Sequence, residues 1–107
     1  MSVLLEFAMF PTSDECRKGA SVSDQVAKIV DMIDRSGYPY QLTPMGTIVE
    51  TDTVSEALAI VEKAYGELGE CERVYSTVKL DIRKGKSGRL RGKIASVEEK
   101  IGRSVRR

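Results

Sequence analysis

The sequence predicts an α+β domain in which two helices cover one face of a four-stranded antiparallel sheet. Four segments have the composition of strands, and two amphipathic segments with helical spacing separate them in the order β-α-β-β-α-β. Two interleaved β-α-β halves that share one sheet form the ferredoxin-like arrangement. The length suffices for a single domain, with a core over 1–83 and a basic helical tail over 84–107.

The first strand is expected over Val3 to Phe10, where every residue except Glu6 is apolar. Glu6 either faces solvent or serves a specific role, since charged side chains are rarely buried without a partner. The first helix is expected to begin at Ser21–Asp24, with either serine as its cap, and to end at Gly37. Its apolar stripe at helical spacing comprises Val22, Val26, Ile29 and Ile33.

The central stretch Tyr38–Glu50 contains two prolines, which keep the preceding residues out of the helical region. It predicts a pair of strands, Tyr40–Leu42 and Gly46–Thr51, joined through Thr43–Gly46. Packing alone does not require a Thr-Pro-Met-Gly-Thr sequence there. A rigid polar segment in the middle of a small sheet indicates a ligand site.

A capping box formed by Thr53 and Glu56 predicts the start of a second helix, which Gly69 should end. The last strand is expected over Glu72–Ile82, with strict alternation of apolar and polar residues. The buried side of the second helix is expected to comprise Val54, Ala57, Leu58, Val61, Ala64, Tyr65 and Leu68. The polar face of the last strand, which must meet water, a ligand or another subunit, comprises Arg73, Tyr75, Thr77, Lys79 and Asp81.

Charge is distributed unevenly, since ten of the 17 Lys and Arg residues but only two of the 16 acidic residues lie at or after Arg83. This asymmetry is typical of nucleic-acid binding or of a basic end that folds onto an acidic surface. Nucleic-acid binding is the less favoured interpretation, because no aromatic residues are interleaved for base stacking. A helix with a narrow apolar stripe that docks on the domain or on a neighbouring chain is expected from Leu90, Ile94, Val97 and Ile101.

Composition argues against several classes of function. The chain has no histidine, which removes the commonest general base and metal ligand and lowers the expectation of an enzyme. No phosphate-binding loop or metal motif is present, and Cys16 and Cys71 are expected to be ordinary reduced thiols. No apolar run spans a membrane and no basic leader precedes the first strand, so we expect a cytoplasmic protein with no membrane contact.

The polar side chains on the predicted strands suit a flat heteroaromatic ligand. Such a ligand needs a ring to stack on, hydroxyls for its edge nitrogens, and a carboxylate if it is cationic. Ordinary strand polarity with a buried tyrosine pair explains the same residues equally well. The set comprises Glu6, Tyr38, Tyr40, Thr43, Thr47, Thr77 and Lys79.

The sequence resembles the small thiamine-binding (YkoF-like) family of ferredoxin-like proteins over most of residues 3–83. The Leu42–Thr47 block with its Pro-Met-Gly-Thr core is the most specific part of the likeness. The other matching segments are Glu6-Phe7 with Pro11, Ser21–Ser23, Ser36-Gly37 with Pro39-Tyr40, Glu50, and the pattern from Arg73 to Arg83 that includes Thr77, Lys79 and Asp81.

The resemblance implies a pocket for thiamine or its hydroxymethylpyrimidine half, no catalysis, no other cofactor, and assembly into homodimers or homotetramers. A tyrosine or methionine would pack on the pyrimidine ring, hydroxyl and backbone groups would bond its nitrogens, and Glu6 would offset a positive charge. The ligand contacts implied by position are Glu6, Ser21, Ser23, Tyr40, Thr43, Met45, Gly46, Thr47 and Thr77.

We therefore expect a non-catalytic carrier, buffer or sensor of thiamine or a related pyrimidine. One alternative is an oligomeric regulatory module of the amino-acid-sensing type, which shares this topology and would bind its ligand chiefly through backbone groups between subunits. A second is nucleic-acid binding through the basic tail, which predicts a steep salt dependence. An enzyme is the third.

Overall fold

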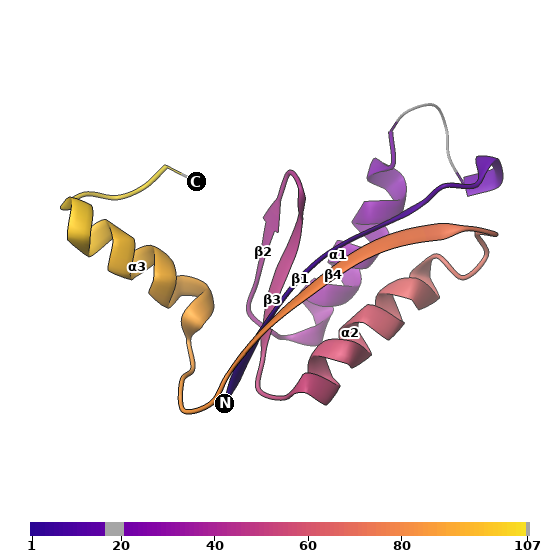
Figure 1. Cartoon of the computed structure of the whole chain (residues 1–107). Coiled ribbons are helices and arrows are strands. Elements are labelled where there is room, and N and C mark those ends of the chain that lie inside the picture. Colours follow the sequence, from indigo (N-terminus) through magenta and orange to yellow (C-terminus); the bar gives the residue numbers. More distant parts are fainter. Residues whose placement is uncertain (17–20, 107) are drawn as a thin grey trace.

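The computed structural model describes residues 1–16 and 21–106 and has the expected ferredoxin-like topology (Figure 1). Its four strands form one antiparallel sheet in the order β2-β3-β1-β4, with α1 and α2 on one face. The elements are β1 (Ser2–Pro11), a short 3-10 turn η1 (Asp14–Cys16), α1 (Ser23–Ser36), β2 (Tyr40–Thr43), β3 (Gly46–Thr51), α2 (Val54–Glu67), β4 (Val74–Arg83) and α3 (Arg89–Ile101).

The core lies between the sheet and the helices α1 and α2. Alternate residues of β1 face this core, and they are almost completely buried: Val3, Leu5, Phe7 and Met9. Because side chains alternate across a strand, the intervening residues of β1 face the other side of the sheet, which we call the open face. The open face also carries the β3 residues that pair with them, Ile48 opposite Glu6 and Glu50 opposite Leu4.

The first helix ends as predicted but does not begin as predicted. Gly37 is its C-cap, with a positive φ of 84° that glycine adopts without steric cost. Its N-cap is Val22, and no side chain caps the helix. The Ser21 hydroxyl accepts a hydrogen bond from the Ser23 backbone N–H at 3.3 Å, a local turn that takes the serine away from the capping position.

The second helix begins at the predicted capping box, where the Thr53 hydroxyl accepts the Glu56 N–H at 3.1 Å. It ends at Glu67, with Leu68 rather than Gly69 as its C-cap. Its buried face is rotated from the predicted one, because Leu58 and Tyr65 are half exposed. The residues that it buries are Ala57, Ile60 and Ala64, followed by Leu68.

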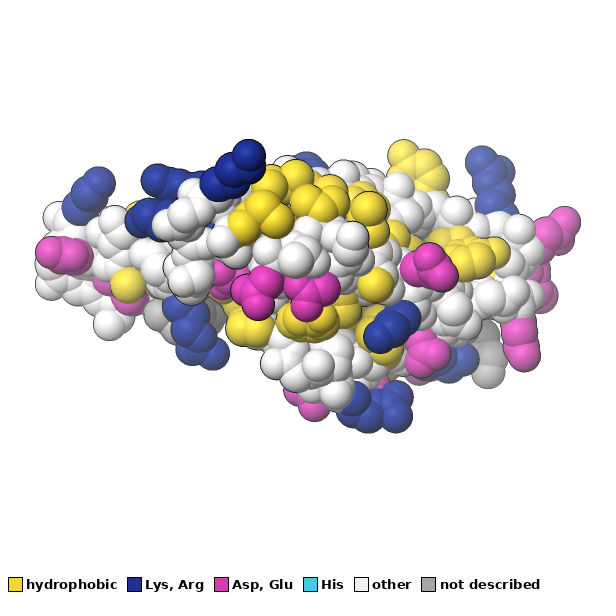
Figure 2. Space-filling view, turned by 90° about the horizontal axis from the view of Figure 1, so that it is seen from below, with side chains coloured by type: hydrophobic (Ala, Val, Ile, Leu, Met, Phe, Trp, Pro, Cys, Tyr) yellow, Lys and Arg dark blue, Asp and Glu magenta, His cyan; other side chains and the backbone are white. Residues whose placement is uncertain are grey.

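The edge strand β4 keeps an uncovered apolar row. Val78, Leu80 and Ile82 pair with Phe7, Leu5 and Val3 of β1 and therefore face the helix side. They remain 41, 37 and 49% exposed, since α2 packs over β1 and β3 instead of over β4. Figure 2 shows the molecule from below the view of Figure 1, and hydrophobic side chains gather in the middle of the surface seen there.

The third helix lies on the other side of the sheet from α1 and α2 (Figure 1). Only its first turn is firmly anchored, by Arg89 and Leu90, which are 5 and 9% exposed. Further along, Val97 and Ile101 are 49 and 44% exposed, so the second half of the predicted apolar stripe is only half covered in the single chain. No helix in the described part of the chain has the length and apolar character needed to span a membrane.

Buried polar groups at the start of α3 form a network that the sequence did not predict. The Arg89 guanidinium donates to the backbone oxygens of Ser2 (2.9 Å) and Asp81 (2.6 Å) and forms a 3.0 Å ion pair with the Asp81 carboxylate. Lys93 also donates to Asp81 at 3.3 Å. The hydrogen bond from Lys93 is the largest cause that lowers the pKa of Asp81 below its usual value. Arg89 lowers it further, whereas burial opposes both. Part of the basic tail thus folds onto an acidic group of its own domain.

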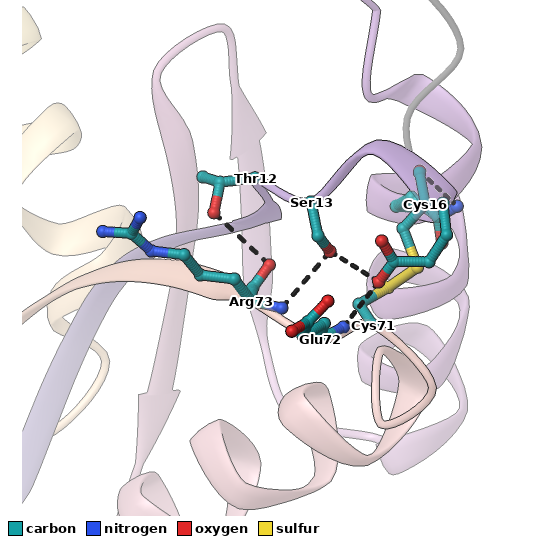
Figure 3. Close-up of a disulfide and its surroundings, with 8 residues drawn as sticks. Thr12, Ser13, Cys16, Cys71, Glu72 and Arg73 are labelled. Carbon is teal, nitrogen blue, oxygen red and sulfur yellow. Dashed lines mark hydrogen bonds between the residues drawn. A yellow bond between two sulfur atoms is a disulfide. The ribbon is translucent and has the colours of Figure 1, made fainter.

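The expectation of two reduced thiols is wrong for this structure, because Cys16 and Cys71 form a disulfide (Figure 3). Their sequence positions are 55 residues apart, and only the folded sheet brings η1 beside the segment that follows α2. Neighbouring hydrogen bonds fasten the same two segments, from the Arg73 N–H to the Ser13 hydroxyl (3.2 Å) and from the Glu72 N–H to the Glu15 carboxylate (2.6 Å). The Glu72 contact is the main cause that lowers the pKa of Glu15.

Candidate functional site

A cavity of about 240 Å³ lies between the first turns of α1, the β2–β3 hairpin and the far end of β1. We call it the hairpin cavity. It is lined by Phe7, Ala8, Met9 and Phe10 of β1, by Val22, Val26 and Ile29 around the first half of α1, and by the continuous block Leu42–Thr47.

The register of the sheet explains why a cavity opens here. The pairing of β1 with β3 ends at Phe7 and Thr47, whereas β1 continues to Pro11. The hairpin turn approaches β1 very closely at that point, and a Cβ built on Gly46 would lie 2.9 Å from the Phe7 carbonyl oxygen. Glycine is therefore required at the floor of the cavity by close backbone approach and not by an unusual φ.

Thr43 holds the hairpin turn in shape. Its hydroxyl donates to the Gly46 carbonyl (2.8 Å) and accepts the backbone N–H groups of Met45 (3.3 Å) and Gly46 (3.1 Å). This arrangement leaves Met45 at the tip of the turn with 88% of its surface exposed. An exposed flexible thioether at the mouth of an apolar cavity is able to pack on an aromatic ring that enters it.

Thr47, a nearly buried residue, carries a hydroxyl in the wall of the cavity. The residue is 5% exposed, and no other described residue forms a hydrogen bond with its side chain. The hydroxyl is not completely sealed from the cavity, because the described residues include no fully buried side-chain polar atom without a partner. It is thus a polar group in an apolar wall, available to a ligand as donor or acceptor.

Among the described residues, the lining of the hairpin cavity contains no ionisable side chain. Its polar groups are threonine hydroxyls and the backbone of the turn. Such a set is able to bind and orient a neutral ring.

A wider groove of about 820 Å³ continues from the cavity along α1 and β2. We call it the α1–β2 groove. Ser23 and Tyr40 line it, and the Tyr40 hydroxyl donates to the Asp34 carboxylate at 2.8 Å. This hydrogen bond is the main reason why the pKa of Tyr40 is raised, with burial and the Asp34 charge adding to it. The phenol stays neutral and keeps Asp34 in place.

The other predicted contacts lie elsewhere. Ser21 borders a third cavity of about 350 Å³ next to Cys16. Glu6 and Thr77 are on the open face of the sheet, because Glu6 pairs with Ile48 and Thr77 with Ala8. The Glu6 carboxylate forms a half-exposed ion pair with Lys79 at 3.4 Å.

The structure therefore divides the predicted ligand contacts into three groups. Four line the hairpin cavity, namely Thr43, Met45, Gly46 and Thr47. Ser23 and Tyr40 border the adjoining groove, with Ser21 nearby, whereas Glu6 and Thr77 are separated from the cavity by the thickness of the sheet.

Sequence reasoning assigned some of the cavity wall to the core and missed Asp34. Val22 and Val26 belong to the predicted apolar stripe of α1, yet they are only partly buried because they cover the cavity. The helical spacing of these residues did not predict that the first turn of α1 would cover a cavity and not the sheet. Asp34 lies six residues before Tyr40, and only the reversal of the chain at Gly37 brings the two together.

Comparison with known proteins matches this chain to one family model and to several relatives. The model of a family described as "Thiamine-binding protein" matches residues 5–98. The UPF0045 protein of Methanothermobacter thermautotrophicus is 34% identical over 83 residues, which cover 76% of this chain and 84% of that protein. The UPF0045 protein of Mycobacterium bovis is 32% identical over 99 residues, which cover 92% of this chain and 93% of that protein.

Two solved structures share the fold. That of a Methanocaldococcus jannaschii protein matches with a TM-score of 0.76 and 30% identity, over 92% of this chain and 97% of that one. A Thermotoga maritima protein, for which a role in thiamine biosynthesis or salvage has been suggested, matches with a TM-score of 0.68 over 95% of this chain and 97% of that one. At 16% identity, the second likeness supports the fold alone.

Proposed function

Because this chain belongs to the thiamine-binding protein family, we propose that it binds thiamine or its hydroxymethylpyrimidine half in the hairpin cavity, without chemical turnover. The observation that carries the proposal is the hydroxyl of Thr47, which is nearly buried and unpartnered among the described residues. A buried polar group without a protein partner is costly unless a ligand or water bonds to it.

The size of the hairpin cavity supports a single ring as its occupant. Its 240 Å³ lies below the range of about 300–1,000 Å³ that is typical of pockets for drug-sized ligands. A pyrimidine ring would lie against the apolar side chains of β1 and α1, with Thr47 at its polar edge. Met45 would close over the exposed face of the ring.

Binding without turnover is supported by the same lining. Among the described residues, the cavity lining has hydroxyl and backbone groups and no side chain suited to act as a general acid or base. We propose on this basis a carrier, buffer or sensor role, and we keep the cytoplasm as the proposed compartment.

We further propose that the protein works as a homo-oligomer, a dimer or tetramer. The support is the apolar surface that the single chain leaves uncovered, on β4 at Val78, Leu80 and Ile82 and on α3 at Val97 and Ile101. Uncovered rows of apolar side chains on a small domain are typical of interfaces, and here one row lies on each side of the sheet.

Calorimetric titration with thiamine and, separately, hydroxymethylpyrimidine tests the binding proposal. We expect one saturable site per chain, and Thr47→Val should weaken binding by about 2- to 12-fold, the worth of one hydrogen bond. Thr77→Val is the matched control, because it makes the same change on the open face, and it should leave the affinity unchanged.

A Glu6→Ala arm decides between the two faces of the sheet. If binding were lost in Glu6→Ala but unaffected in Thr47→Val, the ligand would occupy the open face and the assignment to the hairpin cavity would be wrong. If neither ligand bound at millimolar concentration, the proposed function itself would be refuted.

A further inference from the structure

The hairpin cavity and the α1–β2 groove adjoin each other and share an apolar wall. Val22, Val26, Leu42 and Pro44 line both of them. A ligand with two linked rings is therefore able to place one ring in each without crossing a polar barrier.

The far end of the groove differs in charge from the cavity. Asp31 and Asp34 line it, both near the C-terminal end of α1, where the helix dipole is negative. Arg35 offsets the charge of Asp31 through a 2.8 Å ion pair. Among the described residues, Asp34 contacts the neutral Tyr40 hydroxyl and no basic group, so its negative charge is not compensated.

Tyr40 places an aromatic ring beside this carboxylate. The side chain is partly buried in the groove and is held there by its 2.8 Å bond to Asp34. An aromatic face and an uncompensated carboxylate next to an apolar floor are the features that bind organic cations. A second, independent feature that points to a ligand is the unpartnered Thr47 hydroxyl in the adjoining cavity.

We propose that the α1–β2 groove is a subsite for a positively charged heteroaromatic ring, which contacts Tyr40 and Asp34 while a neutral ring occupies the hairpin cavity. The proposal rests on the proposed function and refines it, because it makes the cationic two-ring compound thiamine the preferred ligand over hydroxymethylpyrimidine. The counter-charge is then Asp34, on the helix side of the sheet, and not Glu6, which is on the open face and already paired with Lys79.

The test compares the affinities of the two ligands in Asp34→Asn. The amide keeps an oxygen that accepts the Tyr40 hydroxyl and removes only the charge. Because Asp34 is exposed and screened by water, we expect a loss of about 3- to 10-fold for thiamine, diminished by salt, and no change for hydroxymethylpyrimidine. Asp24→Asn, at the other end of α1, is the matched control and should affect neither ligand.

A pair of substitutions at Tyr40 separates the ring from the hydroxyl. Tyr40→Phe keeps the aromatic face and should retain most of the preference for thiamine, whereas Tyr40→Leu should abolish it.

Each outcome decides between the proposals. Equal weakening of both ligands in Asp34→Asn, or no weakening of either, would overturn the cation subsite. Binding of hydroxymethylpyrimidine with no preference for thiamine would overturn the subsite while the proposed function stands. Failure of both ligands to bind the unmodified protein would overturn both.

Discussion

The carboxylate of Glu50 on β3 caps the helix α3 by accepting the backbone N–H of Arg89 at 3.0 Å. The other carboxylate oxygen accepts the N–H of Leu90 at 3.0 Å. The Ser2 hydroxyl donates to the oxygen that accepts Arg89, at 2.7 Å. A helix N-terminus leaves unsatisfied N–H groups and a positive dipole end, and this carboxylate satisfies both. Gly88, the local N-cap residue, makes no side-chain cap, so the start of α3 depends on a residue 39 positions away.

We predict that Glu50→Gln releases the start of α3. The amide nitrogen would face a backbone donor, so the free energy of unfolding should fall by about 1–3 kcal/mol. Urea unfolding gives the energy, and hydrogen exchange should show faster exchange of the α3 amides. Glu6→Gln, at an exposed ion pair on the same face, is the control and should change the energy by less than about 1 kcal/mol. Equal effects of the two variants would contradict the capping role of Glu50.

The same carboxylate should give the protein an acid-sensitive contribution to stability. Burial by itself would raise the pKa of Glu50, but bonds from Ser2, Leu90 and Arg89 and the Arg89 charge together lower it. A lowered pKa in the folded state means that the contribution is full above the unfolded value, about 4.3, and is lost as pH falls through the folded value. The difference in unfolding free energy between the unmodified protein and Glu50→Gln should therefore be constant near neutral pH and shrink below about pH 4. A difference that grew on acidification would contradict a lowered pKa of Glu50 in the folded state.

Gly46→Ala should damage both the fold and the ligand site. Its new Cβ would meet the Phe7 carbonyl oxygen at 2.9 Å, a backbone atom that cannot move away without separating the strands. We expect a loss of about 1–3 kcal/mol in unfolding free energy, with weaker thiamine binding. Gly66→Ala is the matched control in α2, because its Cβ would meet no atom within 4 Å, and it should stabilise the protein by up to about 1 kcal/mol. If both variants behaved alike, the close approach at Gly46 would be refuted.

Loss of the disulfide should destabilise the protein without unfolding the sheet. Cys71→Ser removes a cross-link between residues 55 positions apart, which is expected to cost about 2–4 kcal/mol. Dithiothreitol should lower the melting temperature of the unmodified protein and leave that of Cys71→Ser unchanged. Disulfides are rare in the cytosol, so thiol labelling in intact cells would also test the proposed compartment. Free, labelled thiols in purified, non-reduced protein would contradict the pairing.

Self-association should depend on the apolar stripe of α3. Val97→Asp places a charge in the exposed stripe, and sedimentation velocity should show a shift from oligomer to monomer. Ser96→Asp adds the same charge to the neighbouring exposed position and should leave the assembly intact. A monomeric unmodified protein at about 100 µM, well above the micromolar range of weak stable dimers, would refute the oligomer.

The element order was predictable from the sequence because local signals agreed with the final packing. The apolar strand β1, the Gly37 stop and the Thr53–Glu56 capping box all appear in the structure as expected. The hairpin was predictable for the same reason, since Thr43 bonds only within its own turn. Two predictions failed, the first because of a competing local turn and the second because of packing. Ser21 bonds to Ser23 and does not cap α1, and α2 turns Leu58 and Tyr65 away from the core.

The amino-acid sequence by itself determined the strands and helices, their order and the block that forms the hairpin, because periodicity and turn chemistry act over a few residues. Only the tertiary structure decided which side chains meet. Strand register puts Thr47 and Glu6 on opposite faces, chain reversal places Asp34 against Tyr40, and sheet closure joins Glu50 to Arg89 and Cys16 to Cys71. These contacts depend on register and helix position over long separations, and a shift of a single residue in a strand would reverse the face on which each side chain lies.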